Sequence, residues 1–253
     1  MEYPEIDRYA SLDSPLHRLD PRIKLVSFIV LIFSIVLLPA VELAIIALVA
    51  SILFLLVSQL PVRFVMKHVR WVFLFIVPFL IIMPFTVKGT DFFTFGGLGV
   101  TYEGVEFGFL VSIRALAAVM LIFPMVGTMR FDTTLKALYH MRVPNLLVQM
   151  LMFTYRYIFI FIDEFSRMQR AMKSRGFKVG TNLHTFNTIG RAVGMLLVRS
   201  YERAERVYQA MLSAGYTGNP RTLFDFKSSP KDYIYGFIII VFAVLLHVPA
   251  VIL

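Results

Sequence analysis

Long apolar blocks alternate with short polar segments along most of this sequence. The five blocks that we interpret as membrane spans cover residues 23–38, 41–57, 71–87, 105–126 and 233–253. A transmembrane helix needs about 20 consecutive apolar residues, with a tolerated range of roughly 17–25. The first two blocks together are too long for one bilayer, and Pro39 lies between them. We therefore expect a hairpin of two spans there.

The third and fourth blocks are joined by a polar segment with its own pattern. Residues 88–104 contain five glycines among aromatic and polar residues. This segment is expected to form a loop or a short hairpin at the outer interface. Inside the third block, Pro78 and Pro84 each remove a backbone donor, so both are expected to kink that helix.

A sixth apolar stretch, residues 145–162, contains only one charged residue, Arg156. It continues directly into Asp163 and Glu164 and then into a basic segment. Crossing the membrane here would place that basic segment outside, against the positive-inside rule. We favour a long helix that lies along or under the membrane, and a further span remains the alternative.

Composition supports a membrane class. Hydrophobic residues make up 58% of the 253, and 25 residues are Phe. A soluble domain is roughly 45–50% apolar. A membrane barrel would need short strands of alternating polarity, which this chain lacks. The sequence has no Cys, which excludes disulfides, zinc–thiolate sites and Cys nucleophiles.

The positive charge is concentrated in one region. Residues 129–232 hold 16 Lys and Arg against 7 Asp and Glu, which equals the net charge of +9 of the whole chain. Under the positive-inside rule this region is cytoplasmic, so nucleic acid is not the expected partner. We expect four spans within 1–128, a cytoplasmic region over 129–232 and the last span over 233–253. The N-terminus is then cytoplasmic and the protein multi-pass in a prokaryotic cell membrane.

A short motif recurs inside the basic region. Ala171–Phe177 reads Ala-Met-Lys-Ser-Arg-Gly-Phe, and Ala210–Tyr216, 39 residues later, reads Ala-Met-Leu-Ser-Ala-Gly-Tyr. Each copy ends a helix-compatible run with a Gly, which accepts the left-handed conformation at a helix C-terminus. We call these two ends the tips; their central residues are Ser174, Arg175 and Gly176, and Ser213, Ala214 and Gly215.

Each tip follows an apolar stripe with helical spacing. The first stripe is Phe161, Phe165, Met168 and Met172, and the second is Tyr201, Ala204, Tyr208 and Met211. On periodicity alone, the simpler interpretation is two helices packed on each other by these stripes. A solvated face has no reason to repeat the motif, however, so the repeat favours docking of the tips on a partner.

Arg114 lies inside the fourth apolar block. An arginine there costs at least ~2.5 kcal/mol on insertion scales, so it should face the bundle, a polar cavity or an interface. Two interpretations stand equally: a structural or gating contact within a larger complex, and a buried Arg paired to backbone carbonyls.

Several motifs together resemble one family. Ser14–Lys24, the segment from Arg114 through Thr128 to Pro144, and Ser200–Met211 resemble the transmembrane T component of energy-coupling-factor transporters. Within that group they are most similar to the cobalt transport branch, CbiQ. The resemblance covers essentially the whole chain, and the N-terminal motif and the paired helix ends are its specific parts.

The resemblance implies a role for the tips. In the family, two helix ends of the form x-Arg-Gly are coupling ends that sit in grooves on two ATP-binding-cassette ATPase subunits, here CbiO-like. It implies the same for Ser174-Arg175-Gly176 and for Ser213-Ala214-Gly215, although Ala214 stands where an Arg is usual. The cargo site would lie on a separate membrane subunit of the CbiM/CbiN type. The expected fold is an all-α integral membrane protein with about five transmembrane helices and a cytoplasmic region of long helices ending in two coupling tips.

No residue pattern indicates catalysis or a bound metal. The sequence has no P-loop of the form Gly-x4-Gly-Lys-Ser/Thr, and its five His are scattered without a metal-binding spacing. We therefore expect a non-enzymatic subunit without a cofactor, for an importer of cobalt ions. Nickel or a vitamin as cargo is one alternative. A membrane scaffold that binds anionic lipid through residues 129–232 is another.

Overall fold

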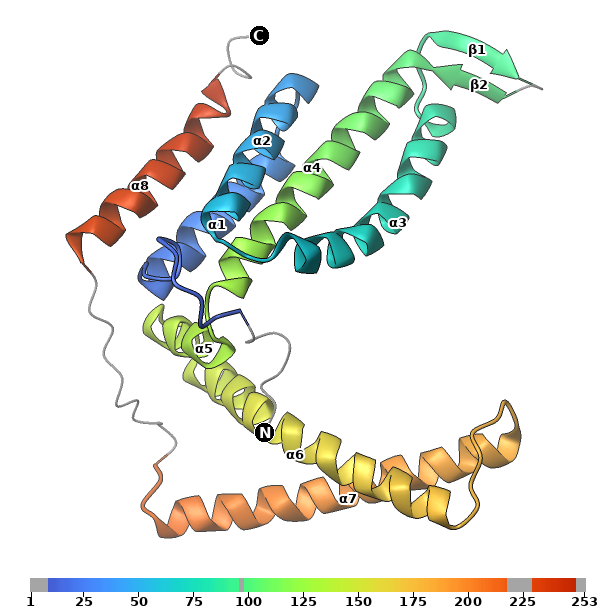
Figure 1. The fold of residues 1–253 in the computed structure, drawn as a ribbon, viewed down its shortest axis with the longest axis vertical. Coiled ribbons are helices and arrows are strands. Elements are labelled where there is room, and N and C mark those ends of the chain that lie inside the picture. Colours follow the sequence, from blue (N-terminus) through green and yellow to red (C-terminus); the bar gives the residue numbers. More distant parts are fainter. Residues whose placement is uncertain (1–8, 96–97, 218–228, 249–253) are drawn as a thin grey trace. The chain divides into compact units, whose positions relative to one another are not determined.

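The computed structural model describes residues 9–95, 98–217 and 229–248. Within these residues the chain forms eight helices and one two-stranded hairpin (Figure 1). It divides into two compact units. Unit 1 is Met1–Ala137 with Phe226–Leu253, and unit 2 is Leu138–Asp225.

Unit 1 is a bundle built around one long helix. Its helices are α1 (Pro21–Val36), α2 (Val41–Val57), α3 (Val62–Thr86), α4 (Tyr102–Gly127) and α8 (Pro230–Leu245). α4 packs against α1, α2 and α3, and α8 packs on α1. The largest buried cluster joins α1, α2, α4 and α8 through side chains such as Phe28, Leu31 and Leu121. The short helix α5 (Phe131–His140) follows α4.

Apolar side chains also cover the outside of the helices. Phe33, Leu53 and Phe75, for example, are 66%, 56% and 69% exposed. A water-soluble protein would bury such side chains, whereas lipid accommodates them. By length and composition, α3, α4 and α6 (Asn145–Ser174) each suffice to cross a membrane, and α2 is a shorter apolar helix. The expected all-helical integral membrane fold is confirmed.

Helix bounds differ from the apolar blocks in one informative place. α3 begins at Val62, nine residues before the third block, and so includes the basic residues Arg63, Lys67 and Arg70. Hydropathy marks where lipid begins, whereas Lys and Arg are good helix formers and let the helix continue past that point. Pro78 and Pro84 lie inside α3, which bends along its length (Figure 1).

The segment after α3, expected as a loop or a short hairpin, forms a hairpin. β1 (Asp91–Phe95) pairs antiparallel with β2 (Leu98–Thr101), with Phe95 opposite Leu98. The Thr101 hydroxyl accepts a hydrogen bond from the Gly104 backbone N–H, which starts α4.

Unit 2 consists of two long helices, α6 and α7 (Leu183–Ser213), which contact each other and cross (Figure 1). Residues 175–182 connect them. The Asn182 side chain accepts a hydrogen bond from the Thr185 N–H at 2.9 Å and caps α7. Both tips therefore belong to this unit.

Candidate functional site

The two tips end their helices with the same set of hydrogen bonds. In the first, the Phe177 N–H donates to the Met172 carbonyl at 3.1 Å and the Gly176 N–H donates to Lys173 at 3.0 Å. In the second, Tyr216 donates to Met211 and Gly215 to Leu212, both at 2.9 Å. This pair of bonds is the Schellman motif, which satisfies the last carbonyls of a helix.

The glycines of the tips are required by the backbone. Gly176 has φ of 83° and Gly215 has φ of 82°, a region that side chains with a Cβ rarely adopt. Nothing lies within 4 Å of a Cβ built at either position. Gly is therefore required at these positions by the positive φ and not by a lack of space for a side chain.

The residue before each Gly has nearly the same backbone in both tips. Arg175 has φ −91° and ψ 14°, and Ala214 has φ −84° and ψ 5°. Both are exposed, as are Ser174, Ser213 and the two glycines. Ala214 thus stands at the position that Arg175 occupies in the first tip, and only the first tip presents a charge there.

The serines of the tips bond to their own helices. The Ser174 hydroxyl donates to the Ala171 carbonyl and the Ser213 hydroxyl donates to the Gln209 carbonyl, each at 3.0 Å. Both hydroxyl protons are therefore used in hydrogen bonds to the carbonyls of their own helix. The surface presented by each tip is its backbone and the side chain at the 175 or 214 position.

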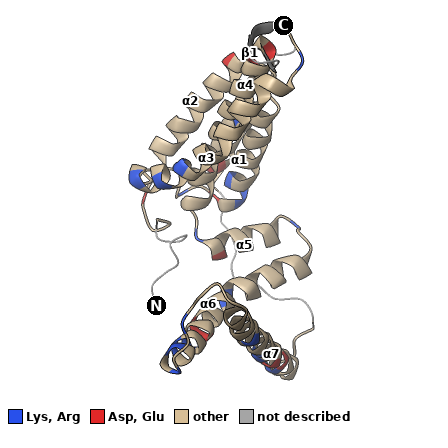
Figure 2. Ribbon diagram, turned by 90° about the vertical axis from the view of Figure 1, so that its right-hand side faces the viewer, with Lys and Arg blue, Asp and Glu red and all other residues tan. Residues whose placement is uncertain are grey.

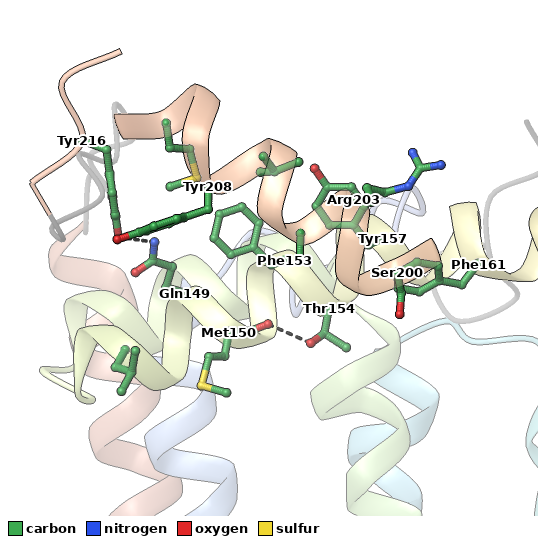
Figure 3. Close-up of a pocket in the computed structure, with 14 residues that line it drawn as sticks. Gln149, Met150, Phe153, Thr154, Tyr157, Phe161, Ser200, Arg203, Tyr208 and Tyr216 are labelled. Atoms are coloured by element: carbon green, nitrogen blue, oxygen red, sulfur yellow. Dashed lines mark hydrogen bonds between the residues drawn. The ribbon is translucent and has the colours of Figure 1, made fainter. Parts of the chain in front are cut away.

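The second tip is also tied to the start of α6. The Gln149 side chain donates a hydrogen bond to the hydroxyl of Tyr216 (Figure 3). Beside this bond, α6 and α7 enclose an open, mainly apolar groove of about 490 Å³. Its lining includes Met150, Phe153, Tyr157, Phe161, Tyr208 and Met211 (Figure 3).

The two apolar stripes of α6 and α7 pack on each other only in part. Ala204, Tyr208 and Met211 of the second stripe line the groove together with the first half of α6, whereas Phe161 is the one member of the first stripe on it. Tyr201 is 73% exposed. The helices cross, so they contact over a limited length, and sequence spacing cannot give the crossing point.

An ion-pair cluster joins α6 and α7. The Glu164 carboxylate accepts hydrogen bonds from Arg199 of α7 and from Arg167 of α6, the latter at 2.9 Å. Its side chain is only 15% exposed. The sequence does not indicate this pair, because Arg199 lies 35 residues from Glu164.

Arg114 is half-buried in α4. Within the part of the chain that the structure describes, its buried Nε has no hydrogen-bond partner. For this atom the interpretation as an Arg paired to backbone carbonyls therefore fails.

Sequence reasoning missed a second buried cation. Lys24, in the N-terminal motif, is 1% exposed, and its Nζ donates to the Thr128 hydroxyl at 3.0 Å. That hydroxyl donates in turn to the Pro124 carbonyl at 2.6 Å. The ammonium thus lies at the C-terminal end of α4, where the helix dipole favours positive charge.

The described residues contain no group of three or more His, Asp or Glu side chains placed to hold a metal ion. The feature that occurs twice in unit 2 is the geometry of the tips.

A family model for cobalt transport proteins, CbiQ, matches residues 13–223. The energy-coupling factor transporter transmembrane protein EcfT of Heliobacterium modesticaldum is 27% identical over 90% of this chain and 90% of its own length. EcfT of Ruminiclostridium cellulolyticum is 29% identical over 85% of this chain and 84% of its own length. An uncharacterized protein of Methanocaldococcus jannaschii is 25% identical over 95% and 84% respectively.

The family match spans most of both units and includes both tips. The chain therefore belongs to the cobalt transport protein family, CbiQ, as a non-catalytic transmembrane component of an energy-coupling-factor transporter.

Proposed function

We propose that the two tips dock on a pair of ATP-binding-cassette ATPase subunits and transmit their motion to a substrate-binding subunit in the membrane. The observation that carries this proposal is the duplicated helix end. Two exposed tips share the same Schellman bonds and nearly the same backbone angles. Two similar ATPase subunits need two similar contacts, whereas a lipid surface needs charge alone.

Arg175 is the residue with which the first tip would recognise its ATPase. Its guanidinium is always charged and has five donors in a fixed fork, which suits a carboxylate in the partner's groove. Exposure at a rigid helix end keeps the side chain available for that contact.

The second tip would dock by shape. Ala214 offers no charge, and among its nearest basic neighbours Arg203 lines the groove between α6 and α7 while Arg206 is exposed. The contact of this tip would therefore rest on the Gly215 backbone and on the exposed Arg206. We infer that the two ATPase contacts are of unequal strength.

The favoured cargo is cobalt ions, and the description of the matching family model supports it. The relatives carry the general transporter name, so nickel or a vitamin stays the alternative. The cargo site would lie on the separate CbiM/CbiN-like subunit, whose identity in a purified complex decides the cargo class.

The proposed topology places the N-terminus and unit 2 in the cytoplasm of a prokaryotic cell. Lys and Arg gather mainly at one end of the helices of unit 1, and their helix bodies are nearly free of charge (Figure 2). This distribution supports the positive-inside assignment. Although α6 is long and apolar enough to cross, we place it along the membrane, so that its basic end stays inside.

The test is a pull-down of the tagged chain from its native membranes in mild detergent. Arg175→Glu should reduce recovery of the ATPases about tenfold or more, because it sets like charges against each other in a docked contact. Arg191→Glu makes the same charge change at an exposed site of α7 away from the tips, and it should leave recovery unchanged.

Two results would contradict the proposal. In one, no ATPase accompanies the unmutated chain, and tight binding to anionic liposomes would then favour the scaffold alternative. In the other, both charge reversals weaken recovery equally, which would point to general electrostatics and not to docking of the tip.

A further inference from the structure

Arg114 lies deep in the membrane. It follows the first residue of α4 by twelve positions and precedes the last by thirteen, so it is about 18 Å from either helix end at a rise of about 1.5 Å per residue. The headgroup regions lie beyond a hydrocarbon core of about 30 Å. The guanidinium therefore has little access to lipid phosphates or to bulk water.

This guanidinium also lacks a complete set of partners in the described chain. Its Nε is buried without a hydrogen bond, while the residue as a whole is half-buried, so part of it reaches the surface of unit 1. Ser112, the neighbouring polar residue, donates to the Gly108 carbonyl of its own helix at 2.6 Å. One bond of this kind would not satisfy Arg114, because its guanidinium has five N–H donors.

The described spans of unit 1 supply no carboxylate at this depth. Among the described helices of unit 1, α1 and α3 contain no Asp or Glu. The acidic residues of the other spans are confined to their first two turns, namely Glu42 in α2, Glu103 and Glu106 in α4 and Asp232 in α8. The described spans of unit 1 therefore leave Arg114 without a counter-charge at its own depth, and a helix of another chain could supply one.

We propose that Arg114 binds a carboxylate on a transmembrane helix of the substrate-binding subunit, which packs beside this part of α4. A carboxylate can take two parallel hydrogen bonds from the guanidinium, and the surrounding low dielectric strengthens them. The contact would fix the position of the substrate subunit along α4, at a site separate from the tips. This inference rests on the proposed function, because it assumes a partner subunit in the membrane.

The experiment is the same pull-down, with ATPases and substrate subunit quantified separately. Arg114→Gln should lower recovery of the substrate subunit about tenfold or more while the ATPases stay bound. The reason is that the carboxylate of the substrate subunit would be left buried without its counter-charge. Arg114→Lys should retain more of it, because the charge remains. Arg70→Gln, at an exposed site of α3, is the control and should change nothing.

Cross-linking gives a second and independent measurement. The chain has no Cys, so Ala115→Cys carries a unique thiol beside Arg114. A short bifunctional reagent should link it to a transmembrane helix of the substrate subunit in the intact complex. This readout does not require any variant of Arg114 to fold.

The outcomes separate the two proposals. If the unmutated chain retains no ATPase but Ala115→Cys cross-links to a membrane partner, the proposed function fails and the Arg114 contact stands. Full retention of the substrate subunit by Arg114→Gln overturns the contact. A parallel loss of ATPases and substrate subunit would also overturn the contact, because it would indicate a folding role. A loss of co-purified anionic lipid alone would overturn it as well.

Discussion

At the scale of single residues, Gly176 and Gly215 differ from Gly190 and Gly194 in their backbone and not in their surroundings. Gly190 and Gly194, inside α7, are equally open, with nothing within 4 Å of a built Cβ. Among the glycines that the structure describes, the two in the tips alone have positive φ. The same substitution should therefore have opposite effects at the two kinds of site.

Gly176→Ala and Gly215→Ala should each destabilise the helix end by about 1–2 kcal/mol, the cost of the left-handed conformation for a residue with a Cβ. Gly190→Ala should stabilise α7 by about 0.5–1 kcal/mol, because it removes backbone entropy from the unfolded chain. Hydrogen exchange at the Phe177 and Tyr216 amides reports the first effect. Unchanged protection in both tip variants would mean that the Schellman bonds do not depend on Gly.

Lys24 and Thr128 allow a similar comparison of two substitutions. Thr128→Val leaves the buried ammonium without its hydroxyl partner, which costs about 1–3 kcal/mol. Lys24→Met removes the charge and keeps the volume, so it should cost less than Thr128→Val. Thermal unfolding in detergent measures both, and the reverse order would show that the charge itself stabilises the end of α4.

At the scale of elements, α6 and α7 are linked by few polar contacts, so their crossing depends on single side chains. Glu164 bridges the helices near the crossing, and Gln149 bonds to Tyr216 at the second tip. The distance between the tips is then set by this crossing. A coupling element needs that distance to be defined, because differential contacts in two states are what transmit free energy.

Glu164→Gln should loosen the crossing only slightly, since the Arg199 side chain is half-exposed and solvent screens its ion pair. Spin labels on Lys173→Cys and Leu212→Cys, both at exposed sites near the tips, should then show a broader distance distribution. Glu202→Gln removes an exposed carboxylate of α7 and serves as the control. Equal distributions in all three proteins would show that apolar contacts alone hold the crossing.

Ala214→Arg should give the second tip the charge that the first tip has. The backbone angles at 214 match those at 175, so the new side chain would leave its helix in a similar direction. ATPase retention in the pull-down should rise several-fold if the second groove accepts a cation. A fall in retention would mean that this groove selects a small residue.

At the scale of the whole molecule, the functional proposal depends on which side of the membrane each segment occupies. Lys178, after the first tip, and Lys88, before the hairpin, are both exposed. Each can be replaced by the only Cys in the chain. Lys88→Cys should react with a membrane-impermeant maleimide in intact cells, and Lys178→Cys only after the membrane is opened. Labelling of Lys178→Cys from outside would show that α6 crosses the membrane.

The sequence by itself determined the features that depend on local chemistry. Apolar length predicted the helical membrane class, residues 88–104 were expected as a loop or a short hairpin, and the repeat predicted two Gly-terminated helix ends. These properties arise within one or two turns of chain, where neighbours in sequence are neighbours in space. The third apolar block did not give the start of α3, because helix formation continues beyond the apolar residues.

Only the tertiary structure decided which distant side chains meet. Lys24 reaches Thr128 across 104 positions, Gln149 reaches Tyr216 across 67, and Glu164 reaches Arg199 across 35. Each group has many chemically equivalent partners in the sequence, and helix packing selects among them. For the same reason the isolation of Arg114 became visible only in the folded bundle, once its neighbouring helices were known and none carried an acid at its depth.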